Sequence, residues 1–217
     1  MITILNREEI YNKSIIADLE IANRQQFYFS LLEGENPDLI DELLPIYDHL
    51  EANVKTETKS DAFLILAFDE NLSKLSYEKG LIQSLFMFFL QLGINEILMV
   101  QDLCNNWQEF GFLSKKEKKA FLNLTKDSMS NEGLLLDLRG LQEILPLLFH
   151  SNPDKGDFSL YSQNGNIPFC MLYWEDNFHI SFFEKDRIAF QDAAKASSLL
   201  LYSREEFTEY FYGKRIK

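Results

Sequence analysis

The sequence predicts an α+β protein that is predominantly helical: a helical N-terminal two-thirds is followed by a three-stranded antiparallel meander and C-terminal helices. Three observations predict this fold class. Apolar residues recur at helical spacing through much of the first 150 residues, capping patterns start several of these segments, and short apolar runs around an Asn-Gly turn follow residue 150. The 217-residue length suits a single domain with two structural halves, a helical half at 1–150 and a β-meander plus helices at 151–217.

The first segments are predicted to be helical. Residues 1–5 read as a short strand or as a lead-in. Asn6 followed by Glu9 predicts a helix start, because the Asn side chain caps the first turn and the acid can bond back to it. Asn36 opens the next helix, and Pro45 kinks or ends that helix because proline removes one backbone hydrogen bond.

Four apolar runs follow in the N-terminal two-thirds. The run at 62–68 suits either a buried strand or a buried helix turn, and its helical neighbours favour helix. The segment 75–92 is apolar nearly all round, which is typical of a helix at the centre of a bundle. Residues 94–104 are also predicted to be helical, and 134–149 is leucine-rich with interruptions at Gly140 and Pro146.

The last third alternates between strand and helix signals. The meander consists of three predicted strands, at 157–163, 168–174 and 178–184, with Asn164-Gly165 as the first hairpin turn. A helix is predicted at 186–197. Ser114 with Glu117 and Ser203 with Glu206 are capping boxes, which predict the starts of two further helices.

Composition and charge exclude several function classes. The net charge of −13 disfavours nucleic-acid binding through a broad basic face and disfavours anionic membranes. The N-terminus does not resemble a signal peptide, and the apolar stretch 81–92 is too short to span a bilayer. Cys104 and Cys170 are best explained as buried thiols in a reducing cytosol, so we expect a cytoplasmic protein.

The sequence contains no recognisable catalytic motif. His49, His150 and His179 lack metal-ligand spacing, and neither a phosphate-binding glycine loop nor a nucleophile turn occurs, so we expect no metal and no cofactor. An enzyme is therefore the less favoured class. Its site would lie between the helical half and the β section, and its candidate polar residues are Tyr161, Tyr173, Glu175, Asp176 and His179.

A basic cluster lies at the start of the helix that Ser114 caps. It consists of Lys115, Lys116, Lys118 and Lys119. These lysines oppose the helix dipole, which makes an anion or partner contact one interpretation. The favoured interpretation is a solvated helix face, because no aromatic residues alternate with the lysines as they do in a nucleic-acid groove.

The most informative feature is an acidic window at 25–54. It holds seven acids and no Lys or Arg, so it accounts for 7 of the 13 excess negative charges. Its members are Glu33 and the candidate partner-binding residues Glu35, Asp38, Asp41, Glu42, Asp48 and Glu51. Like charges this close repel by a few tenths of a kcal/mol per pair, so the window is interpreted either as a solubilising surface or as a surface shaped for a basic partner.

These observations support a binding function more than a catalytic one. The first hypothesis is an acidic cytosolic protein that binds a basic protein partner, in concrete form an immunity-type neutraliser of a basic toxin or nuclease. The alternatives are an enzyme with a site that motifs do not reveal, and a regulatory or structural module that forms a homodimer through exposed aromatic residues.

Overall fold

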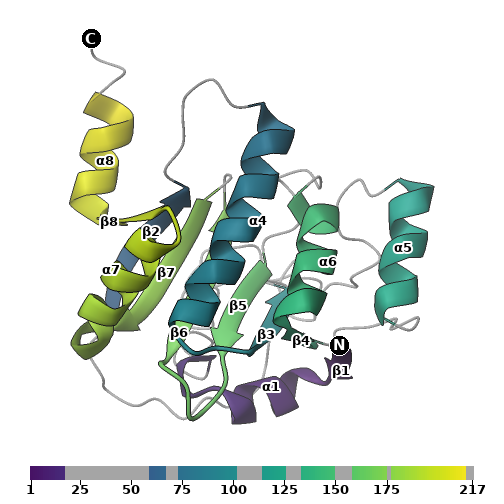
Figure 1. Ribbon diagram of the computed structural model, residues 1–217. Helices are drawn as coiled ribbons and strands as arrows, with labels where there is room; N and C mark the ends of the chain where they lie inside the picture. The colour runs from purple at the N-terminus through teal and green to yellow at the C-terminus, as the bar shows by residue number, and fades with distance from the viewer. Residues whose placement is uncertain are drawn as a thin grey trace, which may run out of the picture.

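An antiparallel sheet forms the centre of the fold (Figure 1). The computed structural model describes residues 1–17, 59–66, 73–101, 114–125, 133–149, 158–174 and 177–213. Within these residues the sheet has eight strands in the order β1-β4-β3-β5-β6-β7-β2-β8, and every neighbouring pair is antiparallel. The strands are β1 (Ile2–Leu5), β2 (Lys59–Leu66), β3 (Glu96–Gln101), β4 (Gly133–Asp137), β5 (Phe158–Ser162), β6 (Phe169–Trp174), β7 (Asn177–Phe183) and β8 (Leu199–Ser203).

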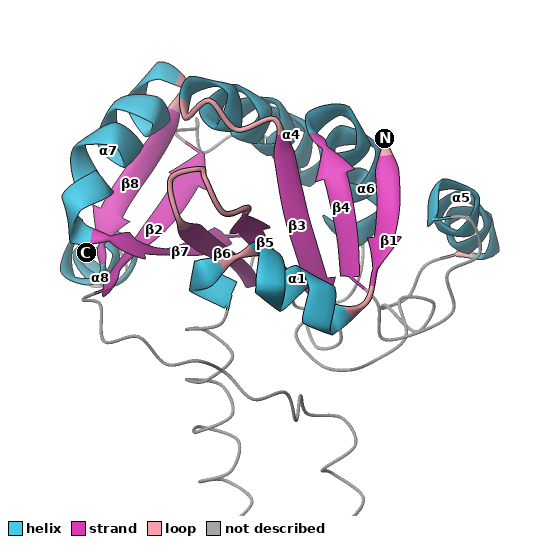
Figure 2. Ribbon diagram, turned by 90° about the horizontal axis from the view of Figure 1, so that it is seen from below, coloured by secondary structure: helices cyan, strands magenta, loops and turns pink. Residues whose placement is uncertain are grey.

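Helices cover both faces of this sheet (Figure 2). The helices are α1 (Arg7–Lys13), α4 (Lys74–Gln91), α5 (Lys115–Thr125), α6 (Leu138–Phe149), α7 (Arg187–Ala196) and α8 (Arg204–Gly213), with a 3₁₀ turn η4 (Glu184–Asp186) ahead of α7. Helices α4, α6 and α7 form a layer on one face, whereas α1 lies on the opposite face. Helix α5 lies beside α6 and the edge strand β1.

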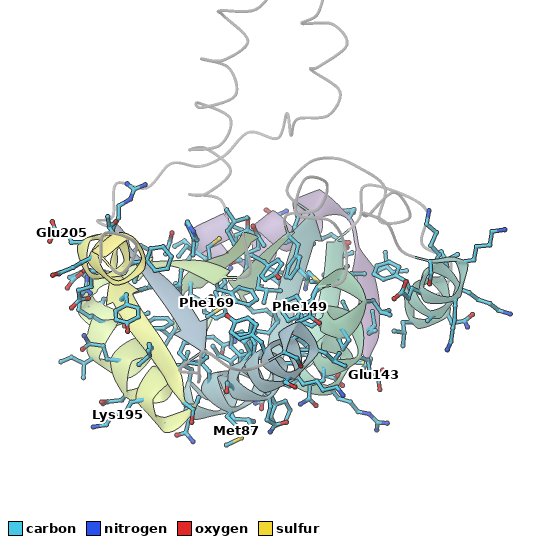
Figure 3. The ribbon with its side chains drawn as sticks, turned by 90° about the horizontal axis from the view of Figure 1, so that it is seen from above. Met87, Glu143, Phe149, Phe169, Lys195 and Glu205 are labelled. Carbon is cyan, nitrogen blue, oxygen red and sulfur yellow. The ribbon has the colours of Figure 1, made fainter. Side chains whose placement is uncertain are left out.

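The main core fills the space between the sheet and the α4–α6–α7 layer. Its aromatic rings are in direct contact: Phe89 stacks on Phe169 of β6 with centroids 5.6 Å apart, and Phe190 of α7 stacks on Phe182 of β7 at 4.6 Å. Figure 3 shows Phe149 and Phe169 directed into this interior. The seven most buried positions of α4 lie on one side of the helix, so α4 packs on a sheet rather than at the centre of a helix bundle.

A second, smaller core lies under α1. Ile10, Ile16 and Ala17 are fully buried against Leu98 of β3 and Cys170 of β6. The Asn6–Glu9 capping box predicted for this helix is confirmed, with the Glu9 amide 2.7 Å from Asn6 Oδ1. Both faces of the central strands are therefore covered with apolar side chains.

The predicted fold class is wrong in its distribution of strands. Instead of a helical N-terminal two-thirds and a three-stranded meander, strands β1, β2, β3 and β4 come from the first 150 residues and join the same sheet as the later strands. The run at 62–68, predicted as helix, contributes to β2, and 94–104 contains β3 rather than a helix. For β3, burial on both faces is the reason, because Ile97 and Met99 belong to the main core and Leu98 and Val100 to the core under α1. A strand that is covered twice shows a continuous apolar run in place of an alternating one.

Several local predictions are confirmed. The three meander strands are β5, β6 and β7, and Gly165 in the first hairpin turn has the positive φ of 93° that such turns require. Helix α7 occupies the predicted 186–197 region, and both capping boxes are present: Ser114 caps α5 and Ser203 caps α8. Strand β8, between these last two helices, was not predicted.

Candidate functional site

The acidic residues predicted to bind a partner lie outside the residues that the structure describes. These are Glu35, Asp38, Asp41, Glu42, Asp48 and Glu51, and the same holds for Cys104, His49, His150, Glu175 and Asp176. The structure does describe the two elements that flank the acidic window along the chain. Ala17 precedes it on the α1 side, and Lys59 follows it as the first residue of β2.

The α1 side of this connection is firmly attached to the sheet. Asn164, in the β5–β6 turn, accepts a hydrogen bond from the Ile15 amide at 2.8 Å through Oδ1, and its Nδ2 donates to the Asn12 carbonyl at 3.2 Å. The Asn164 amide also donates to the Lys13 carbonyl at 2.7 Å. Three hydrogen bonds from one turn residue thus fix the end of α1, while Ile16 and Ala17 are buried beyond it.

The β2 side is held by pairing on both edges of the strand. Lys59 lies opposite Phe183 of β7 at one end, and Leu66 lies opposite Leu199 of β8 at the other. Strand β2 is therefore an internal strand, with ladders to two neighbours. The segment 18–58, which contains the acidic window, therefore begins after residues that pack on the sheet and ends at an internal strand of the sheet.

Charge is distributed very unevenly between the described residues and the rest of the chain. The described residues hold 14 acids and 14 bases, and the remaining residues hold 20 acids and 7 bases, which together give the totals of 34 and 21. The whole net charge of −13 therefore comes from the segments outside the described residues. The segment 18–58 alone has ten acids and two bases, so it carries most of this excess.

The predicted lysine cluster forms an exposed face of α5, which we call the lysine face. It consists of the four exposed side chains Lys115, Lys116, Lys118 and Lys119. Phe121, 1% exposed, and the half-buried Leu124 pack the opposite side of the helix against the core, so the exposed lysines face away from the core. At 100° per residue they span an arc of roughly 160°.

The lysine face is electrostatically unfavourable for α5 itself. Three of its pairs, 115–118, 116–119 and 115–119, have the spacing at which like charges repel by about 0.2–0.5 kcal/mol each. The lysines also lie near the positive end of the helix dipole. Glu117, the acid within this turn, bonds instead to the Ser114 amide at 2.7 Å as part of the cap.

The residues proposed for an enzymatic site are divided between the two faces of the sheet. Tyr161, Cys170 and His179 lie on the α1 face, because Tyr161 and Cys170 belong to the core under α1 and His179 has the same strand parity. Tyr173 lies on the opposite face, where it stacks on Phe149 at 4.7 Å. The site predicted between the helices and the β section is occupied by the main apolar core.

The α1 face carries further polar residues, Ser159, Ser181 and Tyr202, that the sequence alone did not reveal. The strand register forms one row across five strands, which consists of Ser159, Leu172, His179, Phe63 and Tyr202 in that order. Ser181 lies opposite Cys170 in the next row. Strand parity could have revealed this polar face only once the register was known. The Cys170 thiol is 3% exposed, which does not suit a nucleophile that meets substrate from solvent.

The described residues show neither a metal site nor a membrane-crossing helix. Within them, no group of three or more His, Cys, Asp or Glu side chains is arranged to hold a metal ion. The helices in this part of the chain are all too short or too polar to cross a membrane. Comparison of the chain with protein-family models, with curated proteins and with solved structures gives no match.

Proposed function

We propose that this chain is a cytoplasmic protein-binding protein whose acidic window captures a basic protein, in its concrete form an immunity-type neutraliser of a basic toxin or nuclease. One observation carries the proposal: the described residues hold 14 acids and 14 bases, whereas the segment 18–58 alone holds ten acids and two bases. The largest excess is in the segment that joins α1 to β2.

Such a concentration of charge has a functional consequence. A general solubilising surface would spread the acids over the whole protein, whereas a local excess creates a potential that extends about 8 Å into physiological salt. That potential speeds the approach of a positively charged partner and orients it during the encounter. The interacting residues under this proposal are Glu35, Asp38, Asp41, Glu42, Asp48 and Glu51.

The test compares two variants with the same change in net charge. One carries Lys in place of Asp38, Asp41, Glu42 and Asp48. The other, the body variant, carries Lys in place of four exposed acids of the described residues, Glu143, Asp192, Glu205 and Glu209. Affinity capture from the native cell extract at low salt identifies a basic partner, and stopped-flow association with the purified partner then ranks the proteins.

The proposal expects the window variant to lose the partner while the body variant keeps most of its binding. Because both variants gain the same charge, a difference between them reports the location of the charge and not the total. Equal association rates for the two variants would show that the window is not the interface. A partner that remains bound at about 1 M salt, where screening acts within about 3 Å, would also contradict a charge-guided interaction.

An enzyme remains the second candidate, and one observation favours it. Tyr161 of β5 and His179 and Ser181 of β7 lie on the α1 face of the sheet, where the register also places Ser159. A catalytic role predicts that His179→Ala abolishes turnover of a substrate found by screening while the unfolding free energy changes by less than about 1 kcal/mol. Retained turnover would remove His179 from the mechanism.

A further inference from the structure

The segment that follows α7 lies at the rim of the sheet, and we call residues 199–213 the β8–α8 arm. Strand β8 is last in the strand order and pairs with β2 alone among the described strands, and α8 follows it directly (Figure 1). Of residues 199–209, Leu199 is buried at 2% exposed, and the others are half-buried or exposed. The β2–β8 ladder therefore supplies most of the attachment of the arm to the rest of the described structure.

Helix α7, which precedes the arm, is packed much more firmly. Phe190, Ala193 and Ala194 of α7 are buried, and the Phe190 ring stacks on Phe182 of β7 at 4.6 Å. Segments with few buried side chains open at a lower free energy than segments that form the core. The turn between α7 and β8 is thus the boundary between a firmly held helix and a peripheral arm.

The α7–β8 turn consists of Ser197 and Ser198, and both residues are in unfavourable states. Ser198 has a φ of 57°, in the left-handed region, and it is the one non-glycine residue with a positive φ in the described part of the chain. The Ser197 side chain is buried, and its Oγ has no hydrogen-bond partner among the described residues. An extended backbone at these two positions would release the strain at Ser198 and would allow water to reach the Ser197 hydroxyl.

A short, strained turn ahead of an edge strand favours exchange of that strand between two copies of a protein. We propose that the β8–α8 arm exchanges between two copies of this chain, so that β8 of one copy pairs with β2 of the other.

The exchanged dimer re-forms the contacts of the monomer. The same β2–β8 ladder is rebuilt, from Ala62 opposite Ser203 to Leu66 opposite Leu199, with the strand supplied by the other copy. The difference between the two states therefore lies in the turn, which is closed and strained in the monomer and extended in the dimer. This exchange stands apart from the proposed function, because it requires no other protein.

Ser198→Gly and Ser198→Ala are the matched variants for the first test, because both remove the hydroxyl but only glycine adopts a positive φ without strain. The full chain is refolded from urea at about 5 µM and at about 0.5 mM, since concentration favours a dimer. Size-exclusion chromatography with light scattering then measures the dimer fraction. We expect a dimer at the higher concentration for the parent protein and for Ser198→Ala. The association constant of Ser198→Gly should be at least about tenfold lower, because its monomer no longer carries the strain that two turns release on exchange.

A disulfide between β2 and β8 then identifies the chain that supplies β8. In a variant with both Ala62→Cys and Ser203→Cys, the two thiols lie on directly opposite residues of the ladder. The isolated dimer is oxidised in air with copper–phenanthroline and analysed on a denaturing gel without reductant. An exchanged dimer gives covalently linked chains, whereas a dimer without exchange gives single chains with an internal bond. The two single-cysteine variants control for bonds through Cys104 or Cys170.

Three outcomes would overturn the exchange. The first is a parent protein and a Ser198→Ala variant that both stay monomeric at about 0.5 mM. The second is equal association of the glycine and alanine variants, and the third is single chains from the oxidised dimer. The hinge variants leave the ladder intact, so they decide the matter even where the double-cysteine variant does not fold. Since these readouts need no partner protein, failure here and failure of the capture experiment are distinct results.

Discussion

Replacing Phe89 with alanine tests whether α4 is packed against the sheet as the structure shows. The Phe89 ring is fully buried, stacks on Phe169 at 5.6 Å, and meets Phe88 edge-on at 5.7 Å. Truncation removes the ring that packs α4 on β6, and it leaves a cavity between the helix and the sheet. Buried Phe→Ala changes cost about 3–5 kcal/mol, and the two ring contacts place Phe89 in the upper part of that range.

The matched control is Phe86→Ala in the same helix. Phe86 is only half-buried, so its loss should cost roughly 1–2 kcal/mol. Urea unfolding followed by circular dichroism measures both free energies, and the Phe89 variant should also melt roughly 6–20 °C lower than the parent protein. Equal losses for the two variants, or a loss below about 1.5 kcal/mol for Phe89→Ala, would refute the packing of α4 on the sheet.

Three further predictions concern α1 and the last helix. Gly133→Ala should cost about 1–3 kcal/mol in urea unfolding, because the added Cβ would lie 2.9 Å from the Met99 carbonyl and against the Ile10 side chain; unchanged stability would contradict the packing of α1 there. Asn164→Ala should cost roughly 1–2 kcal/mol and speed hydrogen exchange at the Ile15 amide, whereas Asn166→Ala should do neither. The pKa of Glu206 is lowered first by the hydrogen bond from the Ser203 amide, so its stabilising effect is complete above the unfolded-state value near 4.5 and is lost as pH falls through the lowered pKa. The stability gap between the parent protein and Glu206→Gln should therefore close in acid, and a gap that widens on acidification would contradict this.

Elements with local chemical signals could be predicted from the sequence. Three helix starts followed from capping boxes, because a side chain that bonds to a nearby amide acts over three residues and needs no distant partner. The first hairpin of the meander followed from Asn164-Gly165, because few residue pairs tolerate the positive φ of a tight turn. In each case the information lies within a few residues of the element.

The strands β2, β3, β4 and β8 could not be predicted in the same way. Their sequences are short apolar runs such as EILMVQ and GLLLD, which suit a buried strand and a buried helix turn equally. What decides between them is whether a neighbouring strand is available. For β2 that neighbour is β7 on one side and β8 on the other, more than 100 residues away along the chain. The helical signals along the chain around β2 and β3 favoured the wrong state, because local sequence neighbours carry no information about a strand that pairs from far away.

The same distinction applies to the candidate sites. Acid excess and lysine clustering are properties of composition, so both were visible in the sequence, and α5 presents its lysines to solvent as a polar helix face should. The polar α1 face was not visible, because Ser159, His179 and Tyr202 come from three strands that only the sheet register brings into one row. Tyr161 and Tyr173 were predicted to belong to one site, but they project to opposite faces of the sheet. Tyr161 lies opposite Cys170 on the α1 face, whereas Tyr173 lies opposite Phe158 on the other face.

The position of the acidic segment in the fold strengthens the case that its charge is functional. α1 packs against β3, β5 and β6, and β2 lies beyond β7, so a direct connection would cross only a short part of the sheet. Connections in compact domains are commonly 2–6 residues long, whereas 41 residues separate Ala17 from Lys59. Closing the sheet thus requires neither the length nor the ten acids of this segment, and this excess of chain and of charge supports the proposal that the segment binds a basic partner.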